Sequence, residues 1–174
     1  MPALDTLRER LPEAAKDLKL NLQAILRPEN LTQDQVWGVA LTSAFFIGHA
    51  DFAQAMLTDA REAGVSEDLI DDARASAAIM GMNTVFYRFR HLVEKETYGA
   101  IPARLRMVRM SQLKTDKVTF ELMSMACAAL AGCGMCIKAH EATLLQHGAT
   151  EAAINDVIRI AAVSQGVVVA LGLP

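Results

Sequence analysis

Residues 133–140 read Cys-Gly-Met-Cys-Ile-Lys-Ala-His. At helical spacing Cys133, Cys136 and His140 occupy positions i, i+3 and i+7, so two thiols and one imidazole lie on one face of a helix. Glycines on both sides of Cys133 interrupt the preceding helical pattern and predict that this cysteine lies at or near the first turn of a new helix. Free backbone N–H groups and the helix macrodipole favour a thiolate there. The segment therefore predicts a redox-active dithiol beside a base.

The composition around this segment favours one all-α domain. The chain has 174 residues, of which 52% are hydrophobic and 5% aromatic, enough apolar residues for one substantial core. Alanine, leucine and methionine are frequent, whereas clustered β-branched residues are few, which favours helices over strands. We therefore expect residues 1–174 to form a single all-helical domain.

Charge and hydropathy argue against two classes of partner. With 17 basic and 20 acidic residues, the net charge is −3, and no basic run is present that would bind nucleic acid. The uncharged stretch at residues 122–137 has 16 residues, fewer than the roughly 18 to 20 that a membrane span needs. The first seven residues lack the apolar core of a secretory signal. We expect a cytoplasmic protein with no nucleic-acid and no membrane partner.

Apolar periodicity and capping residues predict where the helices begin and end. The T-x-x-Q pattern that begins at Thr32 has the form of a capping box, and Ser66 and Thr150 are suited to cap later helices. Pro28 ends the first helix, and the polar residues 93–104 form a connector. The expected helices cover residues 3–27, 32–48, 50–63, 66–91, 103–111, 116–131, 134–147 and 150–171.

The chain matches itself when it is shifted by 84 residues. The shift superimposes Gly48 on Gly132, and a second pair of glycines and a pair of helix caps coincide as well. Several such matches at one offset predict an internal duplication. One copy covers about residues 32–92 and the other residues 116–174.

The two copies differ where the second carries its reactive side chains. Glu121, Cys133, Cys136 and His140 coincide with unrelated residues of the first copy, which are Trp37, His49, Phe52 and Met56. We therefore interpret the first copy as a degenerate scaffold and the second as the catalytic copy. The comparison adds Glu121 as a candidate, because a carboxylate beside His140 would orient the imidazole and stabilise its charged form.

Other interpretations of these residues stay open at this point. The two cysteines could be small buried residues, or they could bind zinc, with Cys127, His140 or His147 completing the site. Cys127 falls inside a predicted helix and suits the core, whereas His147 suits the C-terminus of a helix. Arginines near the connector form either an ion-paired surface, which we favour, or a site for an acidic partner; they are Arg88, Arg90, Arg104, Arg106 and Arg109.

These residues resemble the signature of alkylhydroperoxidase D, a family of the carboxymuconolactone decarboxylase-like superfamily. The resemblance rests on Glu121 between Phe120 and Leu122, followed by the motif from Gly132 to Glu141, and it extends over nearly the whole chain. It implies an all-α, two-repeat subunit that is commonly a homotrimer. It also implies a redox-active disulfide between the two motif cysteines, with no bound cofactor.

The resemblance further implies a chemistry and a set of partners. The dithiol of such a protein reduces organic hydroperoxides weakly and recycles the disulfide of an alkyl hydroperoxide reductase C-type peroxiredoxin. Its electrons come from dihydrolipoamide on a lipoyl-bearing acyltransferase. By position, Cys136 meets the peroxide and Glu121 and His140 relay its proton. Cys133 completes the disulfide and exchanges with donors.

Met135 departs from the family pattern, since members of the family can carry a histidine between the two cysteines that shares in the relay. A thioether moves no protons, so we expect peroxidase activity to suffer more than disulfide exchange. The other methionines, including Met80, Met107 and Met110, are interpreted as helix packing. The alternative function is a non-catalytic redox adaptor or sensor. A decarboxylase-like or isomerase-like enzyme is disfavoured because that chemistry needs no vicinal dithiol.

Overall fold

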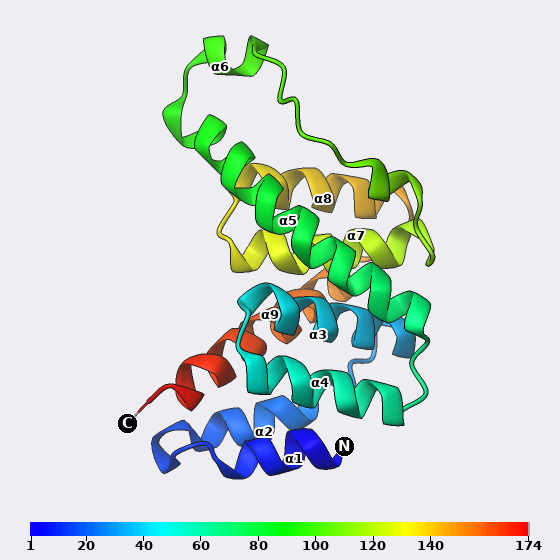
Figure 1. The fold of residues 1–174 in the computed structure, drawn as a ribbon, viewed down its shortest axis with the longest axis vertical. Coiled ribbons are helices and arrows are strands. Elements are labelled where there is room, and N and C mark those ends of the chain that lie inside the picture. The colour runs from blue at the N-terminus through cyan, green and yellow to red at the C-terminus, as the bar shows by residue number, and fades with distance from the viewer. Residues whose placement is uncertain (174) are drawn as a thin grey trace.

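The computed structural model describes residues 1–173, and every regular element in that range is a helix (Figure 1). This confirms the predicted all-α class. The α-helices are α1 (Pro2–Glu9), α2 (Lys16–Ala24), α3 (Gln33–Ile47), α4 (Ala50–Glu62), α5 (Glu67–Val93), α6 (Glu96–Ala100), α7 (Lys117–Leu130), α8 (Gly134–Gln146) and α9 (Glu151–Leu171), and 3-10 turns cover Glu13–Ala15 and Val108–Ser111.

Helices α3 and α7 form the centre of the domain. They pack against each other, and each also packs against both α5 and α9. The middle of α3, from Val36 to Ala44, is buried without interruption, as is α7 from Leu122 to Ala128. A helix surrounded by others needs an apolar surface on all sides, which explains the nearly uncharged sequence of both segments.

Helix α9 alone among the helices of residues 1–173 is long and apolar enough to cross a membrane, by length and composition. Its apolar side is used inside the protein, because Val157, Ile160 and Ala161 are buried and α9 packs against α2, α3 and α7. Such burial is typical of a core helix in a soluble helical domain.

The predicted helix caps are confirmed. Thr32 and Gln35 form both hydrogen bonds of a capping box at the start of α3, and Ser66 and Thr150 cap α5 and α9. Helices α7, α8 and α9 begin 84 residues after α3, α4 and α5. The internal duplication stays a prediction, and these equally spaced helix starts agree with it.

The prediction of one helix over residues 3–27 is wrong, because the chain forms α1 and α2 with a turn between them. Pro12 lies in the turn, and a proline inside a helix removes one backbone hydrogen bond and clashes with the preceding turn. The start of α1 is capped from another helix. Asp59 of α4 accepts hydrogen bonds from the backbone N–H groups of Ala3 (3.0 Å) and Leu4 (2.8 Å).

The prediction of a short helix over residues 103–111 is also wrong. The chain there lacks helical structure up to Met107, and only Val108–Ser111 forms a 3-10 turn, while the connector holds the unpredicted α6. Contacts between this segment and α5 determine its conformation. Arg109 pairs with Asp71 (2.9 Å) and Asp72 of α5, which fastens the segment across that helix.

Two buried aspartates fasten the segments that precede α7 and α3. Asp72 accepts hydrogen bonds from the backbone N–H groups of Lys114 (2.9 Å) and Thr115 (2.7 Å), and from the Thr115 hydroxyl (2.7 Å). Burial alone would raise the pKa of Asp72, but the hydrogen bonds from Thr115, Arg109 and Lys114 outweigh it and hold this pKa below its usual value.

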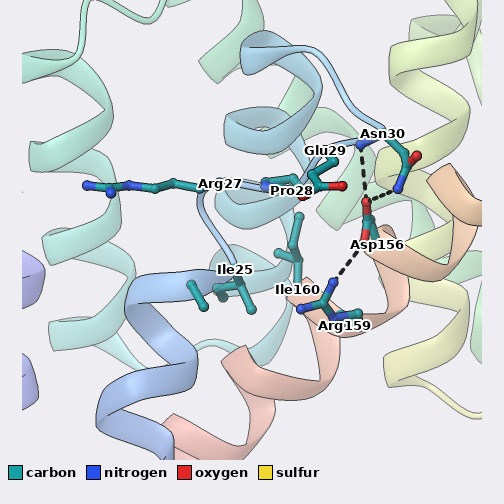
Figure 2. Close-up of a pocket in the computed structure, with 9 residues that line it drawn as sticks. Ile25, Arg27, Pro28, Glu29, Asn30, Asp156, Arg159 and Ile160 are labelled. Carbon is teal, nitrogen blue, oxygen red and sulfur yellow. Dashed lines mark hydrogen bonds and ion pairs between the residues drawn. The ribbon is translucent and has the colours of Figure 1, made fainter.

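Asp156 of α9 fastens the segment that precedes α3. Figure 2 shows Asn30 and Arg159 converging on its carboxylate, with distances of 2.9 Å from the Asn30 side-chain nitrogen and 3.0 Å from Arg159. These groups line a cavity of about 250 Å³ together with Ile25 and Ile160. Because the Asp156 carboxylate is fully used in these contacts, we interpret this cavity as structural.

Candidate active site

The CxxC motif lies at the start of α8, as predicted. Gly132 follows α7 with φ at +63°, a left-handed conformation that residues other than glycine rarely adopt, and it turns the chain into Cys133. Cys133 is the N-cap of α8, and its sulfur accepts a hydrogen bond from the Cys136 backbone N–H at 3.3 Å. The sulfur atoms of the two cysteines lie at disulfide distance, and their Cα atoms are 5.3 Å apart.

The two cysteine residues differ in access to solvent. Cys133 is fully buried, whereas Cys136 is 7% exposed. Both belong to a small apolar cluster with Met80, Cys127 and Ala128, against which Tyr87 and Phe46 pack. Cys136 lines the cavity that is described below.

Glu121 and His140 are brought together by the pairing of α7 with α8. The Oε2 atom of Glu121 lies 2.7 Å from Nδ1 of His140, and the two side chains are 14% and 16% exposed. The contact fixes the imidazole by Nδ1 and leaves Nε2 for another partner. Cys136 and His140 are spaced i and i+4 on α8, so they share one face of that helix.

A cavity of about 300 Å³ opens beside Cys136 and His140. Three separate segments form its wall: α8, the middle of α5, and the chain around the second 3-10 turn. The remaining lining residues are mostly apolar and comprise Met80, Asn83, Tyr87, Met107, Met110, Met135 and Ala139.

Sequence reasoning missed the contribution of α5 to this cavity. Met80, Asn83 and Tyr87 are spaced i, i+3 and i+7, so they share one face of α5. An asparagine on an otherwise apolar helix face is the signal that could have found them. Met80 packs in the buried apolar cluster, as predicted, and it also lines the cavity at the CxxC motif together with Met107 and Met110.

The remaining candidates lie outside the cavity. Cys127 is fully buried in α7, and burial raises the pKa of its thiol well above the usual range, so it stays protonated. His147 follows α8 and contacts the Thr143 carbonyl oxygen (2.8 Å) and the Lys117 Nζ atom (3.2 Å), as suits a helix C-terminus. Within residues 1–173 no group of three or more His, Cys, Asp or Glu side chains is arranged to hold a metal ion.

The connector arginines mostly have partners within the chain. Arg109 pairs with Asp71 and Asp72, while Arg88 and Arg90 donate to the carbonyl oxygens of Ala131 and Ile101. The ion pairs of Arg109 agree with the ion-paired surface that we favoured, whereas for the other four arginines that interpretation stays a prediction.

Comparison with known proteins defines the class. Residues 96–172, which include the CxxC motif, match the Carboxymuconolactone decarboxylase family. The chain is 47% identical over 173 residues to the alkyl hydroperoxide reductase AhpD of Anaeromyxobacter dehalogenans (strain 2CP-C), covering 99% of this chain and 92% of the relative. It is 43% identical over 160 residues to the AhpD of Maricaulis maris (strain MCS10), covering 92% of each chain. The chain belongs to the AhpD family of alkyl hydroperoxide reductases.

Proposed function

We propose that this protein reduces alkyl hydroperoxides with the Cys133–Cys136 dithiol. One observation carries the proposal: Cys136 lines a mostly apolar cavity together with His140, while His140 is held by Glu121 and Cys133 lies within disulfide reach. A nucleophile, a base with an orienting carboxylate and a second thiol are the parts that a thiol peroxidase needs.

The reaction begins with proton transfer from the Cys136 thiol to Nε2 of His140. The Glu121 carboxylate stabilises the resulting imidazolium through its contact with Nδ1. The thiolate attacks the terminal peroxide oxygen, which breaks the O–O bond, gives a sulfenic acid on Cys136 and releases an alkoxide that takes the proton from His140. Cys133 then displaces water from the sulfenic acid and forms the disulfide.

Reduction of the disulfide requires a dithiol donor to reach a sulfur atom. Cys133 is fully buried and Cys136 is the more accessible of the two, so exchange at Cys133 requires the turn before α8 to open. We propose dihydrolipoamide on a lipoyl-bearing acyltransferase as the donor, with an alkyl hydroperoxide reductase C-type peroxiredoxin as a further partner, in the cytoplasm. Support comes from the membership in the AhpD family.

We also propose that the protein is a homo-oligomer, with a trimer favoured. An exposed apolar stripe supports an interface on the second half of α5, where Val85, Phe89 and Leu92 are spaced i, i+4 and i+7 and are 62%, 48% and 71% exposed. Light scattering after size exclusion would report three times the 18.9 kDa of one chain for a trimer.

Consumption of peroxide distinguishes the proposed peroxidase from the alternative function, a redox adaptor. The purified wild-type protein is expected to consume cumene hydroperoxide with dihydrolipoamide as the only reductant and no partner protein present. An adaptor would exchange its disulfide with dihydrolipoamide yet leave the peroxide concentration unchanged apart from the slow background reaction. Absorbance follows the oxidation of dihydrolipoamide, and a peroxide assay run in parallel follows the peroxide concentration. A peroxide concentration that falls no faster than the background would contradict the proposal that the protein is a peroxidase.

The proton relay predicts how thiolate formation responds to substitution. In Glu121→Gln and His140→Gln, the pH midpoint for alkylation of Cys136 is expected to rise by about one unit or more, because the base or its orienting charge is lost. Mass-resolved alkylation rates of the reduced proteins measure the midpoint. His147→Gln is the matched control and is expected to keep the wild-type midpoint, because His147 lies at the far end of α8. Unchanged midpoints in both relay variants would remove the relay from the mechanism.

A further inference from the structure

Asn83 is a buried polar residue with an unused hydrogen-bond acceptor. It lies on α5, is 9% exposed and lines the cavity beside Cys136. Its side-chain nitrogen contacts only the Met107 sulfur, at 3.2 Å, and its Oδ1 atom has no hydrogen-bond partner. A thioether is a weak acceptor, so neither end of this carboxamide has a strong partner within the chain.

Stability gives no reason for an asparagine at this position. A buried carbonyl oxygen without a donor loses its hydration and gains nothing in return, whereas an apolar residue of similar size would fit the wall. Its neighbours on the same face of α5, Met80 and Tyr87, are largely apolar. Buried polar groups are nearly always paired, so an unpaired acceptor in a cavity wall points to a ligand that brings the donor.

The residues that line the cavity indicate the chemistry of the rest of that ligand. Four methionine side chains line the cavity together with Asn83, Cys136 and His140; they belong to Met80, Met107, Met110 and Met135. Methionine side chains are flexible and polarisable, which suits apolar bodies of varied shape. The ligand that fits has an apolar body and one O–H group, and it presents the O–H end near Cys136.

We propose that the cavity binds the apolar body of an organic hydroperoxide and that Asn83 accepts a hydrogen bond from its terminal O–H group. The inference rests on the proposed function and adds the residues that bind the substrate. Oδ1 is covered in this structure, so the proposed contact requires the carboxamide to rotate about its broad terminal torsion and to give up its weak contact with the flexible Met107 side chain.

This contact orients the bond that breaks. The terminal oxygen, held through its hydrogen by Asn83, is the atom that the Cys136 thiolate attacks. That oxygen stays on sulfur as the sulfenic acid and keeps its hydrogen, while the alkoxide leaves and takes the proton from His140. Two electrons pass from sulfur to the peroxide, and no other reactant takes part in this step.

The experiment compares kcat/KM for cumene hydroperoxide and hydrogen peroxide in the wild type and three variants. Asn83→Leu removes the acceptor at similar volume, and Asn155→Leu is the matched control, because Asn155 is exposed on α9. Met110→Gln makes the cavity wall polar at similar volume. Dihydrolipoamide supplies the electrons, and thermal unfolding reports whether each variant is folded. Asn83→Ala replaces Asn83→Leu if leucine prevents folding.

We expect Asn83→Leu to lose about tenfold or more in kcat/KM for cumene hydroperoxide, chiefly through a higher KM, with the alkylation midpoint of Cys136 unchanged. Met110→Gln should lower the preference for cumene hydroperoxide over hydrogen peroxide about fourfold. Values of kcat/KM in Asn83→Leu that equal those of the control Asn155→Leu would overturn the inference. A loss accompanied by a shifted alkylation midpoint would also overturn it, since that marks an effect on the Cys136 thiol rather than on the peroxide; a loss for both peroxides with an unchanged midpoint supports it, because both carry the O–H group from which Asn83 would accept a hydrogen bond. Failure of the proposed function is distinct, because the wild type itself would then consume no peroxide.

Discussion

Replacement of Cys136 by serine is expected to abolish turnover of alkyl hydroperoxides. Cys136 is the cysteine that lines the cavity beside His140, and a serine hydroxyl is too weak a nucleophile to attack the O–O bond. Cys133→Ser is expected to fail differently. Its Cys136 thiolate still attacks one equivalent of peroxide, but the Cys133 thiol that would form the disulfide and continue the cycle is missing, and the only other cysteine, Cys127, is fully buried with a raised thiol pKa.

Rapid mixing of the reduced variants with cumene hydroperoxide distinguishes the two failures. Cys136→Ser should consume no peroxide above background, and Cys133→Ser should consume one equivalent per chain and then stop. Cys127→Ala is the matched control and should turn over normally, because the Cys127 thiol is fully buried in α7, does not line the cavity and stays protonated. Sustained turnover in either serine variant would contradict the proposed cycle.

The second large effect concerns stability. Asp72→Asn is expected to lower the free energy of unfolding by roughly 3 kcal/mol at neutral pH, because it removes a fully buried charge that holds Arg109 and the segment before α7. Urea unfolding monitored by circular dichroism measures the change. Asp71→Asn is the matched control, since Asp71 also pairs with Arg109 but is 45% exposed, and only a small effect is expected.

The contribution of Asp72 should depend on pH in a defined direction. Its folded-state pKa lies below the unfolded value of about 3.9. The stabilisation is therefore fully present above about pH 4 and is lost as the pH falls through the folded-state pKa. The difference in unfolding free energy between wild type and Asp72→Asn should shrink on acidification. A difference that grows toward low pH would contradict this assignment.

Local signals predicted most of the helices correctly because each boundary is set by the residues beside it. Thr32, Ser66 and Thr150 cap their helices through their own side chains, and a glycine turns the chain before α8. The errors arose where distant contacts or one overlooked residue decided the structure. Pro12 divides the first predicted helix, and the segment around Arg109 follows its aspartate partners on α5.

The candidate site was predictable only in part. The spacing of Cys133, Cys136 and His140 follows from one helix, and the shifted comparison of the two copies identified Glu121. Asn83 lies on α5, and only the packing of α5 against α8 brings it to the cavity. Residues that the predicted duplication treats as a scaffold therefore supply part of the cavity wall.

The most direct test of the mechanism is to identify the sulfur that peroxide oxidises. Reduced Cys133→Ser and Cys136→Ser are exposed briefly to cumene hydroperoxide in the presence of dimedone, and the adduct is located by peptide mass spectrometry. We expect a sulfenic-acid adduct on Cys136 in Cys133→Ser and none on Cys133 in Cys136→Ser. An adduct on Cys133, or none in either variant, would contradict the proposal that Cys136 is the peroxide-reducing thiol.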